Sequence, residues 1–249
     1  MKTVTPIKSN HHGFTLVEMA MVLFIVALLL GGLLPTLSSQ VDQRHVTETR
    51  TQLDEIQQAL IGFAVANGRL PCPAVANATG MESPAGGNCT SFSNGYFVGF
   101  VPAATLGLSG TDSAGYAVDS WGNRIRYAVT SWSSSPTNNV FTTTGGMSTV
   151  GISSLSPTIL VCSTATGITG SSCATGAGLT TNGVPAVIFS TGKNGASGGA
   201  GTDELANLDN NNTFVSHLPT LSPNEFDDLV IWLSPNTLIN RMVAAGTLP

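Results

Sequence analysis

The sequence is poor in charged and aromatic side chains. Only 9% of its 249 residues are charged and 6% are aromatic, and the formal net charge is -5. It has no basic stripe that would neutralise a phosphate backbone, so we expect no nucleic-acid partner. The chain also lacks a Gly-x-Ser-x-Gly nucleophile motif, and residues 192–195 lack the groups that complete a phosphate-binding loop. We therefore predict that the protein is not an enzyme.

Cysteine is also scarce, and its spacing is informative. The four cysteines include no Cys-x-x-Cys pair, which argues against a zinc site. An even number of cysteines at such spacings indicates disulfides formed in an oxidising compartment. Three pairings are open, and we favour the one that joins sequence neighbours, because these can meet without any assumption about the fold. The favoured pairs are Cys72 with Cys89 and Cys162 with Cys173.

A long apolar run near the N-terminus contains a single charged residue, Glu18. Residues 14–37 would form about 36 Å of helix at roughly 1.5 Å per residue, which is enough to cross a bilayer core of about 30 Å. The preceding residues 1–13 carry Lys2 and Lys8 but no acid, which predicts a cytoplasmic N-terminus. An acidic side chain inside a membrane helix costs roughly 2.5 to 3.5 kcal/mol, so Glu18 needs a functional explanation.

Residues 13–18 read Gly-Phe-Thr-Leu-Val-Glu. This junction resembles that of the type IV pilin and type II secretion pseudopilin superfamily. The resemblance implies that a prepilin peptidase removes the leader, residues 1–13, by cutting between Gly13 and Phe14, and that Phe14 becomes the N-methylated terminus. It also implies that Glu18 of one subunit meets the terminal amine of its neighbour during assembly. In the alternative interpretation, Glu18 reaches the membrane interface from its place near the helix start.

Three helix-weakening residues, Gly31, Gly32 and Pro35, interrupt the apolar run. Pro35 falls where many members of the superfamily have a helix-bending proline. We expect this weak point to let the helix bend or stretch when subunits pass from the bilayer into a filament. The alternative is that neighbouring groups accommodate these residues within the membrane.

The resemblance implies a structural subunit of a type II secretion or type IV pilus filament. Its partners would be a prepilin peptidase, other pilin or pseudopilin subunits and the assembly platform of the inner membrane. We expect a single-pass protein of the bacterial inner membrane, with a periplasmic C-terminal domain that becomes part of an extracytoplasmic filament. The alternative function is that of a surface-displayed minor pilin that binds a ligand or another cell. Three aromatic residues stand out on the predicted loops as candidates for such binding, namely Trp132, Phe141 and Phe214.

The remaining chain predicts an α+β, pilin-like fold. Residues 38–67 form an amphipathic continuation of the helix that ends at Asn67-Gly68, and residues 68–249 form a β-rich domain with long loops. The apolar face of the helix is expected to comprise Leu53, Ile56, Leu60 and Phe63. No helix-length periodic segment separates the β-rich runs, so we expect an antiparallel sheet that packs against the helix. The predicted strands are residues 96–101, 124–130, 158–162, 185–190 and 229–233, followed by a short helix at residues 236–245.

Two segments of this domain add to the resemblance. Residues 119–127 resemble the Asp-x-Trp-Gly turn and strand of pseudopilins, and residues 189–195 resemble the strand and Gly-rich loop that follow it.

Major pseudopilins hold calcium in a loop near the C-terminus, and acidic residues cluster in the corresponding part of this chain together with Glu204. The resemblance therefore suggests calcium ligands, because calcium prefers several oxygen atoms. The candidate ligands are Asp203, Asp209, Asp227 and Asp228. The favoured alternative is that these are solvated acidic loop residues. No cofactor is required, and calcium is the ion that the cluster would take.

Overall fold

The computed structural model describes residues 13, 15–76, 79–89, 96–131, 139–169, 172–180, 183–199, 201–209 and 211–249, and it describes only the backbone of residues 30–38 and Tyr96. The chain divides into two compact units, Met1–Arg44 and His45–Pro249.

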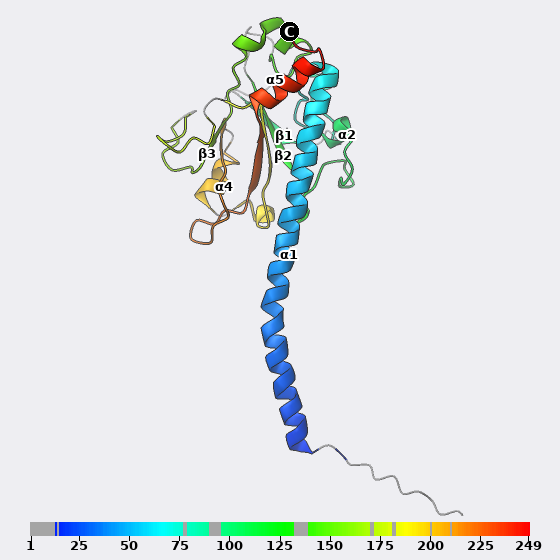
Figure 1. Cartoon of the computed structure of the whole chain (residues 1–249), viewed down its shortest axis with the longest axis vertical. Coiled ribbons are helices and arrows are strands. Elements are labelled where there is room, and N and C mark those ends of the chain that lie inside the picture. The colour runs from blue at the N-terminus through cyan, green and yellow to red at the C-terminus, as the bar shows by residue number, and fades with distance from the viewer. Residues whose placement is uncertain are drawn as a thin grey trace, which may run out of the picture. The chain divides into compact units, whose positions relative to one another are not determined.

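One helix, α1 (Leu16–Asn67), covers both of the predicted helical segments (Figure 1). In the first unit, every described side chain from residue 15 to residue 29 is exposed. The backbone of Gly31, Gly32 and Pro35 is helical, and the predicted bend there stays a prediction.

Within the residues that the structure describes, no helix combines the length and the hydropathy of a membrane span. The anchor at residues 14–37 stays a prediction, and Phe14 and the side chains of residues 30–38 lie outside the described part.

In the second unit, α1 buries three of the four residues of the predicted apolar face, and the fourth, Phe63, is half-buried. Leu53 and Leu60 are fully buried, and Ile56 is 3% exposed. The helix ends at Asn67 because Gly68 takes a left-handed conformation, with φ of 65°, and its N–H donates to the carbonyl of Ala64 at 2.9 Å. Glycine adopts this conformation at little cost, so the predicted stop is confirmed.

A four-stranded antiparallel sheet forms the centre of the second unit. It comprises β1 (Tyr96–Phe100), β2 (Arg126–Thr130), β4 (Ala186–Ser190) and β6 (Leu229–Leu233), in the spatial order β1-β2-β4-β6. Four of the five predicted strands therefore lie in one sheet, and their antiparallel pairing is confirmed.

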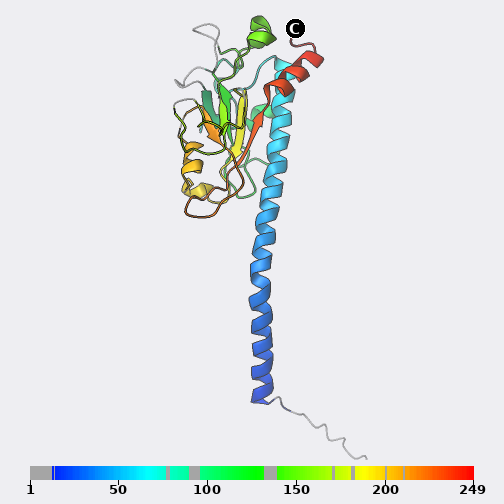
Figure 2. The ribbon, with the colours of Figure 1, turned by 60° about the vertical axis from the view of Figure 1, so that its left-hand side comes forward.

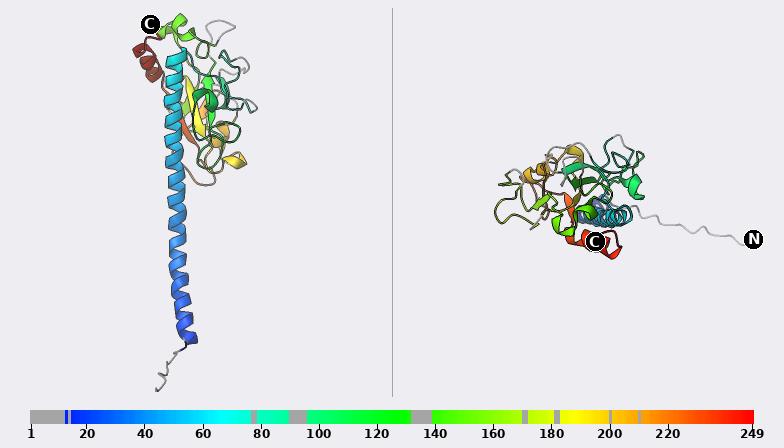
Figure 3. Two further views of the ribbon diagram at one scale, coloured as in Figure 1. Left: turned by 90° about the vertical axis from the view of Figure 1, so that its right-hand side faces the viewer. Right: turned by 90° about the horizontal axis from the view of Figure 1, so that it is seen from above.

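The two faces of this sheet are covered by different elements (Figures 2 and 3). Side chains alternate along each strand, so Tyr127 and Ile188 join the core on one face while Val187 and Phe189 join the core on the other. The first face packs against α1 and the C-terminal helix α5 (Pro235–Ala244). The predicted C-terminal helix is thus confirmed with a shift of one residue.

The second face packs against a small pair of strands that the sequence did not predict correctly. The expected strand at residues 158–162 appears as β3 (Leu160–Cys162), but it lies outside the main sheet and pairs in parallel with β5 (Thr213–Val215). Strand β5 falls in a segment that the sequence assigned to a loop. Strands of three residues carry too little pattern to be recognised, and here Val161 and Phe214 are held by burial against the sheet.

Segments outside the predicted strands also contain short helices. They are α2 (Ala103–Leu106), α3 (Gly146–Val150), η1 (Ile152–Ser154), η2 (Gly195–Ser197) and α4 (Thr202–Ala206).

Both predicted disulfides are present. Cys72 pairs with Cys89 across a Cα–Cα distance of 5.7 Å, and Cys162 pairs with Cys173 across 5.6 Å. Each closes a short loop, for which the chain-entropy model gives about 3 kcal/mol of stabilisation.

Candidate functional site

The start of α1 is held by reciprocal hydrogen bonds between Thr15 and Glu18. One Glu18 carboxylate oxygen accepts from the backbone N–H and the hydroxyl of Thr15, both at 2.9 Å. The backbone N–H of Glu18 in turn donates to the Thr15 hydroxyl oxygen at 3.3 Å. This is a capping box, in which two otherwise unpaired N–H groups at the helix start are satisfied.

The capping box places a carboxylate at the positive end of the helix dipole. Gly13 is exposed two residues before Thr15, while Phe14 and residues 1–12 lie outside the described part. Thr15 was not among the predicted site residues, although the spacing Thr-x-x-Glu before an apolar run is a recognised helix-start signal. Glu18 is thus oriented by its own helix before any neighbour is present.

The turn at residues 119–123 is built around the carboxylate of Asp119. One of its oxygens accepts from the backbone N–H of Trp121 at 3.0 Å and from that of Asn123 at 2.8 Å. The hydroxyl of the intervening Ser120 donates to the carbonyl of His45 in α1 at 2.8 Å. The turn is therefore attached to the part of α1 that belongs to the second unit.

The two segments that resemble pseudopilin elements contact each other directly. The Ser190 hydroxyl donates to Asp119 at 2.5 Å, and the side-chain amide of Asn123 donates to the carbonyl of Gly192 at 2.7 Å. Gly192 has φ of 62°, and a Cβ at this position would overlap the Asp227 side chain, so glycine is required. Gly192 therefore connects the turn at residues 119–123 to Asp227.

Three carboxylates, from Glu204, Asp227 and Asp228, converge beside this loop. Each offers an oxygen, and these oxygens lie within 4.8 Å of one another. Glu204 is 1% exposed and Asp228 is 4% exposed. The backbone N–H of Asp227 donates to Glu204 at 2.9 Å, and the side chain of Asn194 donates to both Glu204 oxygens at 3.1 Å. The arrangement concentrates negative charge in a largely buried space.

Burial of these groups raises the pKa of two of them. The pKa of Asp228 rises from 3.8 to about 7, first because burial removes the carboxylate from water, and further because Glu204 and Asp227 are negatively charged neighbours. The pKa of Asp227 rises to about 6, chiefly through burial, with the charge of Glu204 adding to the effect. The cluster therefore holds protons near neutral pH, although the positive charge of Arg126 opposes the rise in the pKa of Asp228.

The cluster fits a divalent cation that prefers oxygen ligands. Besides the converging carboxylates, Asp227 Oδ1 and Asn194 Oδ1 are buried without a hydrogen-bond partner. Unsatisfied buried oxygens are unfavourable unless a cation or a donor pairs with them. Glu204, Asp227 and Asp228 are the residues that would hold calcium.

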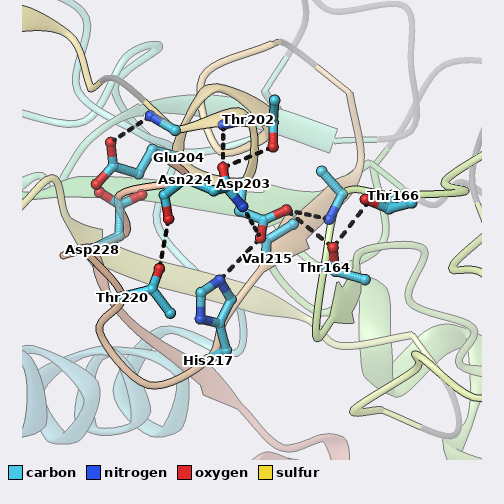
Figure 4. Close-up of polar contacts among 12 residues, drawn as sticks. Thr164, Thr166, Thr202, Asp203, Glu204, Val215, His217, Thr220, Asn224 and Asp228 are labelled. Atoms are coloured by element: carbon cyan, nitrogen blue, oxygen red, sulfur yellow. Dashed lines mark hydrogen bonds and ion pairs between the residues drawn. The ribbon is translucent and has the colours of Figure 1, made fainter. Parts of the chain in front are cut away.

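The structure does not bring the predicted ligand set together. Asp203 is turned away from the cluster and accepts from the N–H of Ala165 at 2.6 Å and from the Thr164 hydroxyl at 3.2 Å, and it contacts His217 at 3.1 Å (Figure 4). Asp209 accepts from the side chain and the backbone of Asn211. Only Asp227 and Asp228 of the predicted set meet, and Glu204 takes the third place. Neighbouring residues of a short helix point in different directions, so the sequence could not choose between Asp203 and Glu204.

The aromatic residues considered for ligand binding do not form an exposed patch in the described part of the chain. Phe141 and Phe214 are each 2% exposed and lie in the core. Trp132 lies outside the described residues. Core packing therefore accounts for the two that the structure describes.

Comparison with known proteins finds one match. Residues 8–34 match the prokaryotic N-terminal methylation motif, which is the signature of type IV pilins and pseudopilins. No curated protein and no solved structure gives a match. The recognition made from residues 13–18 is thus confirmed, and the motif indicates a pilin-like or pseudopilin protein with a structural role in a membrane-anchored, extracytoplasmic filament.

Proposed function

We propose that this protein is a filament subunit of a type II secretion or type IV pilus system. A prepilin peptidase cuts it between Gly13 and Phe14 and methylates Phe14. The processed chain is held in the inner membrane as a single-pass protein by residues 14–37, with its second unit on the periplasmic side. An assembly platform then adds it to a filament of pilin or pseudopilin subunits.

The observation that carries this proposal is the position of the Glu18 carboxylate within the methylation motif. It is fixed at the start of α1 by Thr15, three residues away. A carboxylate has about four lone-pair sites, so Glu18 retains acceptor capacity for another donor. The amine that cutting creates at Phe14 is a donor of opposite charge.

A pairing between Glu18 and the terminal amine of a neighbour gives the assembly a defined stagger. Within an apolar environment, a charge without a partner is strongly unfavourable, so subunits that are shifted along the helix axis lose this pairing. Apolar contacts alone do not specify such a register, because hydrophobic association has no preferred direction. The ion pair therefore selects one arrangement among many apolar ones.

Two substitutions of Glu18 distinguish the effect of its charge on assembly from the effect of its capping hydrogen bonds. Glutamine at this position still completes a capping box, whereas alanine does not. We expect Glu18→Gln and Glu18→Ala both to be cut and methylated normally, as measured by mass spectrometry of the N-terminus, and both to be lost from isolated filaments. Normal incorporation of Glu18→Gln would show that the cap, and not the charge, is what assembly needs.

Processing itself is tested by blocking the cut. A bulky residue in place of Gly13 should leave residues 1–13 on the chain, because the peptidase accepts a small residue before the cut. Intact mass then reports the leader, and the chain should remain in the membrane fraction. Release of the same mature chain from this variant would refute the assigned cleavage position.

Calcium is the second component of the proposal. Bound by Glu204, Asp227 and Asp228, it would neutralise their charges and join α4 to the segment before β6. The unpaired Asp227 and Asn194 oxygens support this assignment. The ion would stabilise this part of the subunit and would take no part in a reaction.

A further inference from the structure

The sheet places one arginine on the same face as the acidic cluster. Arg126 is the first residue of β2 and pairs with Phe189 of β4, which in turn pairs with Val230 of β6. Paired residues share a face, and side chains alternate along a strand, so Asp228, two residues before Val230, belongs to this face as well. A cation and a buried carboxylate of the cluster therefore lie at the same end of one sheet face.

Packing, and not a direct ion pair, holds Arg126 in place. Its side chain is half-buried, and the guanidinium lies over the ring of Phe100, 5.7 Å from the ring centre. Among the residues that the structure describes, no carboxylate forms a direct ion pair with it. Arginine is effectively always protonated in proteins, so a permanent positive charge lies on this part of the sheet.

Arg126 and Asp228 influence each other electrostatically. Burial lowers the pKa of the Arg126 guanidinium, and the negative charge of Asp228 opposes this change. The pKa of Asp228 is raised chiefly by burial, and the positive charge of Arg126 opposes that rise. The two charges therefore interact through space, at a separation longer than that of a direct ion pair.

Two other cations lie near the cluster but are exposed to solvent. The backbone of Lys193 donates a hydrogen bond to Asp227, but Lys193 is exposed. Arg50 of α1 lines a small pocket together with Asp228, and it is exposed as well. Water and salt screen exposed charges, whereas partly buried charges are screened much less. Of these three cations, Arg126 therefore has the largest effect on the energy of a charge in the cluster.

The charges of the cluster and of Arg126 match a divalent cation. Glu204, Asp227 and Asp228 carry three negative charges when they are ionised, and Glu204 and Asp228 point toward each other (Figure 4). Arg126 compensates one of these charges, which leaves two. A divalent cation completes the balance, whereas a trivalent cation would leave one positive charge in excess. An unbalanced charge in a largely buried space is unfavourable.

We propose that Arg126 balances the charge of the acidic cluster and thereby sets its preference for a divalent over a trivalent cation. This role rests on the calcium site of the proposed function, and it identifies the residue that controls which ion the site accepts. Arg126 does not bind the ion itself. It acts by repelling each cation in proportion to the charge of that cation.

Removing the charge of Arg126 should change the affinities for calcium and for terbium unequally. Both ions prefer oxygen ligands, but terbium carries three positive charges. Calorimetric titration of the full chain in detergent at about pH 7.5, above the pKa values of Asp227 and Asp228, measures both dissociation constants. In Arg126→Gln we expect calcium to bind about tenfold and terbium about thirtyfold more tightly, because Coulomb energy is proportional to ion charge. The preference for calcium over terbium should thus fall by about threefold.

Two control variants distinguish charge from packing. Arg126→Lys keeps the positive charge and should leave the ratio of the two affinities nearly unchanged. Arg124→Gln removes a guanidinium that lies 5.8 Å from the centre of the same Phe100 ring but pairs with Asp112 at 2.7 Å. It should leave both affinities unchanged. A change in either control as large as that in Arg126→Gln would overturn the proposal.

A double variant keeps the test decisive if Arg126→Gln does not fold. Arg126→Gln combined with Asp228→Asn removes one charge of each sign, so the two remaining carboxylates again balance a divalent cation. Asp228→Asn alone leaves the charge of Arg126 in excess. Calcium should therefore bind the double variant about tenfold more tightly than it binds Asp228→Asn. Equal or weaker binding by the double variant would overturn the role of Arg126.

The unmodified chain separates a failure of the calcium site from a failure of the role of Arg126. If it binds neither calcium nor terbium, the calcium site of the proposed function is refuted, and the role of Arg126 with it. If it binds calcium and Arg126→Gln has the same two affinities, the calcium site stands and only the role of Arg126 is overturned.

Discussion

Both parts of α1 are helical, but they differ in how far the rest of the chain buries their apolar side chains. In the first unit, large apolar side chains such as Leu23 and Phe24 are 63% and 65% exposed. In the second unit, Leu53 and Leu60 of the same helix are fully buried against the sheet and α5. The apolar face of the second part is therefore buried within the chain, whereas the described side chains of residues 15–29 are exposed.

The difference separates a part of α1 that stabilises the fold of its own unit from a part whose apolar side chains are exposed. The second unit has its own core, two disulfides and a buried ion pair, so its stability depends on its own contacts. The first unit offers an exposed apolar surface, which lipid or other subunits would bury under the proposed function. Substitutions in the two parts should accordingly affect different measurements.

Breaking the buried ion pair of the second unit should have the largest effect on stability. Arg69 and Glu82 pair at 2.7 Å with side chains 6% and 7% exposed, and Glu82 also accepts from the N–H of Cys72. Arg69→Ala leaves a buried carboxylate without its partner and should lower the free energy of unfolding by about 3 to 5 kcal/mol. Chemical denaturation of the chain in detergent measures this value.

The matched control is the less buried pair of Arg124 and Asp112, whose side chains are 35% and 24% exposed. Arg124→Ala should cost no more than about 1 kcal/mol from the ion pair, because solvent screens it. Equal losses for the two arginine variants would contradict the view that burial decides the effect.

Leucine-to-alanine substitutions in the two parts of α1 test directly whether each part contributes to the free energy of unfolding. Leu60→Ala removes a fully buried side chain and should lower the free energy of unfolding by about 2 to 5 kcal/mol. Leu23→Ala removes an exposed one and should change it by less than about 0.5 kcal/mol. Filament yield should fall for Leu23→Ala although its fold is intact. A large loss of unfolding free energy for Leu23→Ala would show that the first unit is packed within the chain.

A smaller, pH-dependent effect is expected at the acidic cluster. The pKa values of Asp227 and Asp228 are about 6 and about 7 in the fold, above the ordinary 3.8. In that interval the folded state binds more protons than the unfolded state, so stability decreases as the pH rises through 6 and 7. In chelator, the melting temperature should be lower at pH 8 than at pH 5.5, and calcium should remove the difference.

Asp228→Asn tests the origin of this dependence. The variant removes the charge but keeps an oxygen for the Asn207 amide, which donates to Asp228 at 2.7 Å. It should raise the melting temperature in chelator at pH 8 and reduce the response to calcium, whereas Glu55→Gln at an exposed position of α1 should do neither. A melting temperature that is independent of calcium at every pH would refute the calcium site.

Local patterns were sufficient for the elements that are long or chemically distinctive. The spacing of Leu53, Ile56 and Leu60 predicted the buried face of α1, and Gly68 predicted its end. The disulfide pairs followed from cysteine spacing, and β6 was predicted with its observed bounds. These features depend on neighbours in the sequence, which the sequence shows directly.

Contacts between distant segments were not predictable in the same way. The parallel pairing of β3 with β5 joins short strands separated by about fifty residues, and its register follows from packing over the sheet. The acidic cluster likewise depends on how α4 faces the segment before β6, which placed Glu204 rather than Asp203 beside Asp228.

The sequence by itself determined the N-terminal motif and its register, since Gly13, Phe14 and Glu18 are read directly from one short stretch of chain. It also determined that α1 has an apolar first part and an amphipathic second part. Only the tertiary structure decided which carboxylates share a space. The physical reason is that helix periodicity and capping are local, whereas the direction of a side chain toward a distant residue is fixed by the packing of the whole unit.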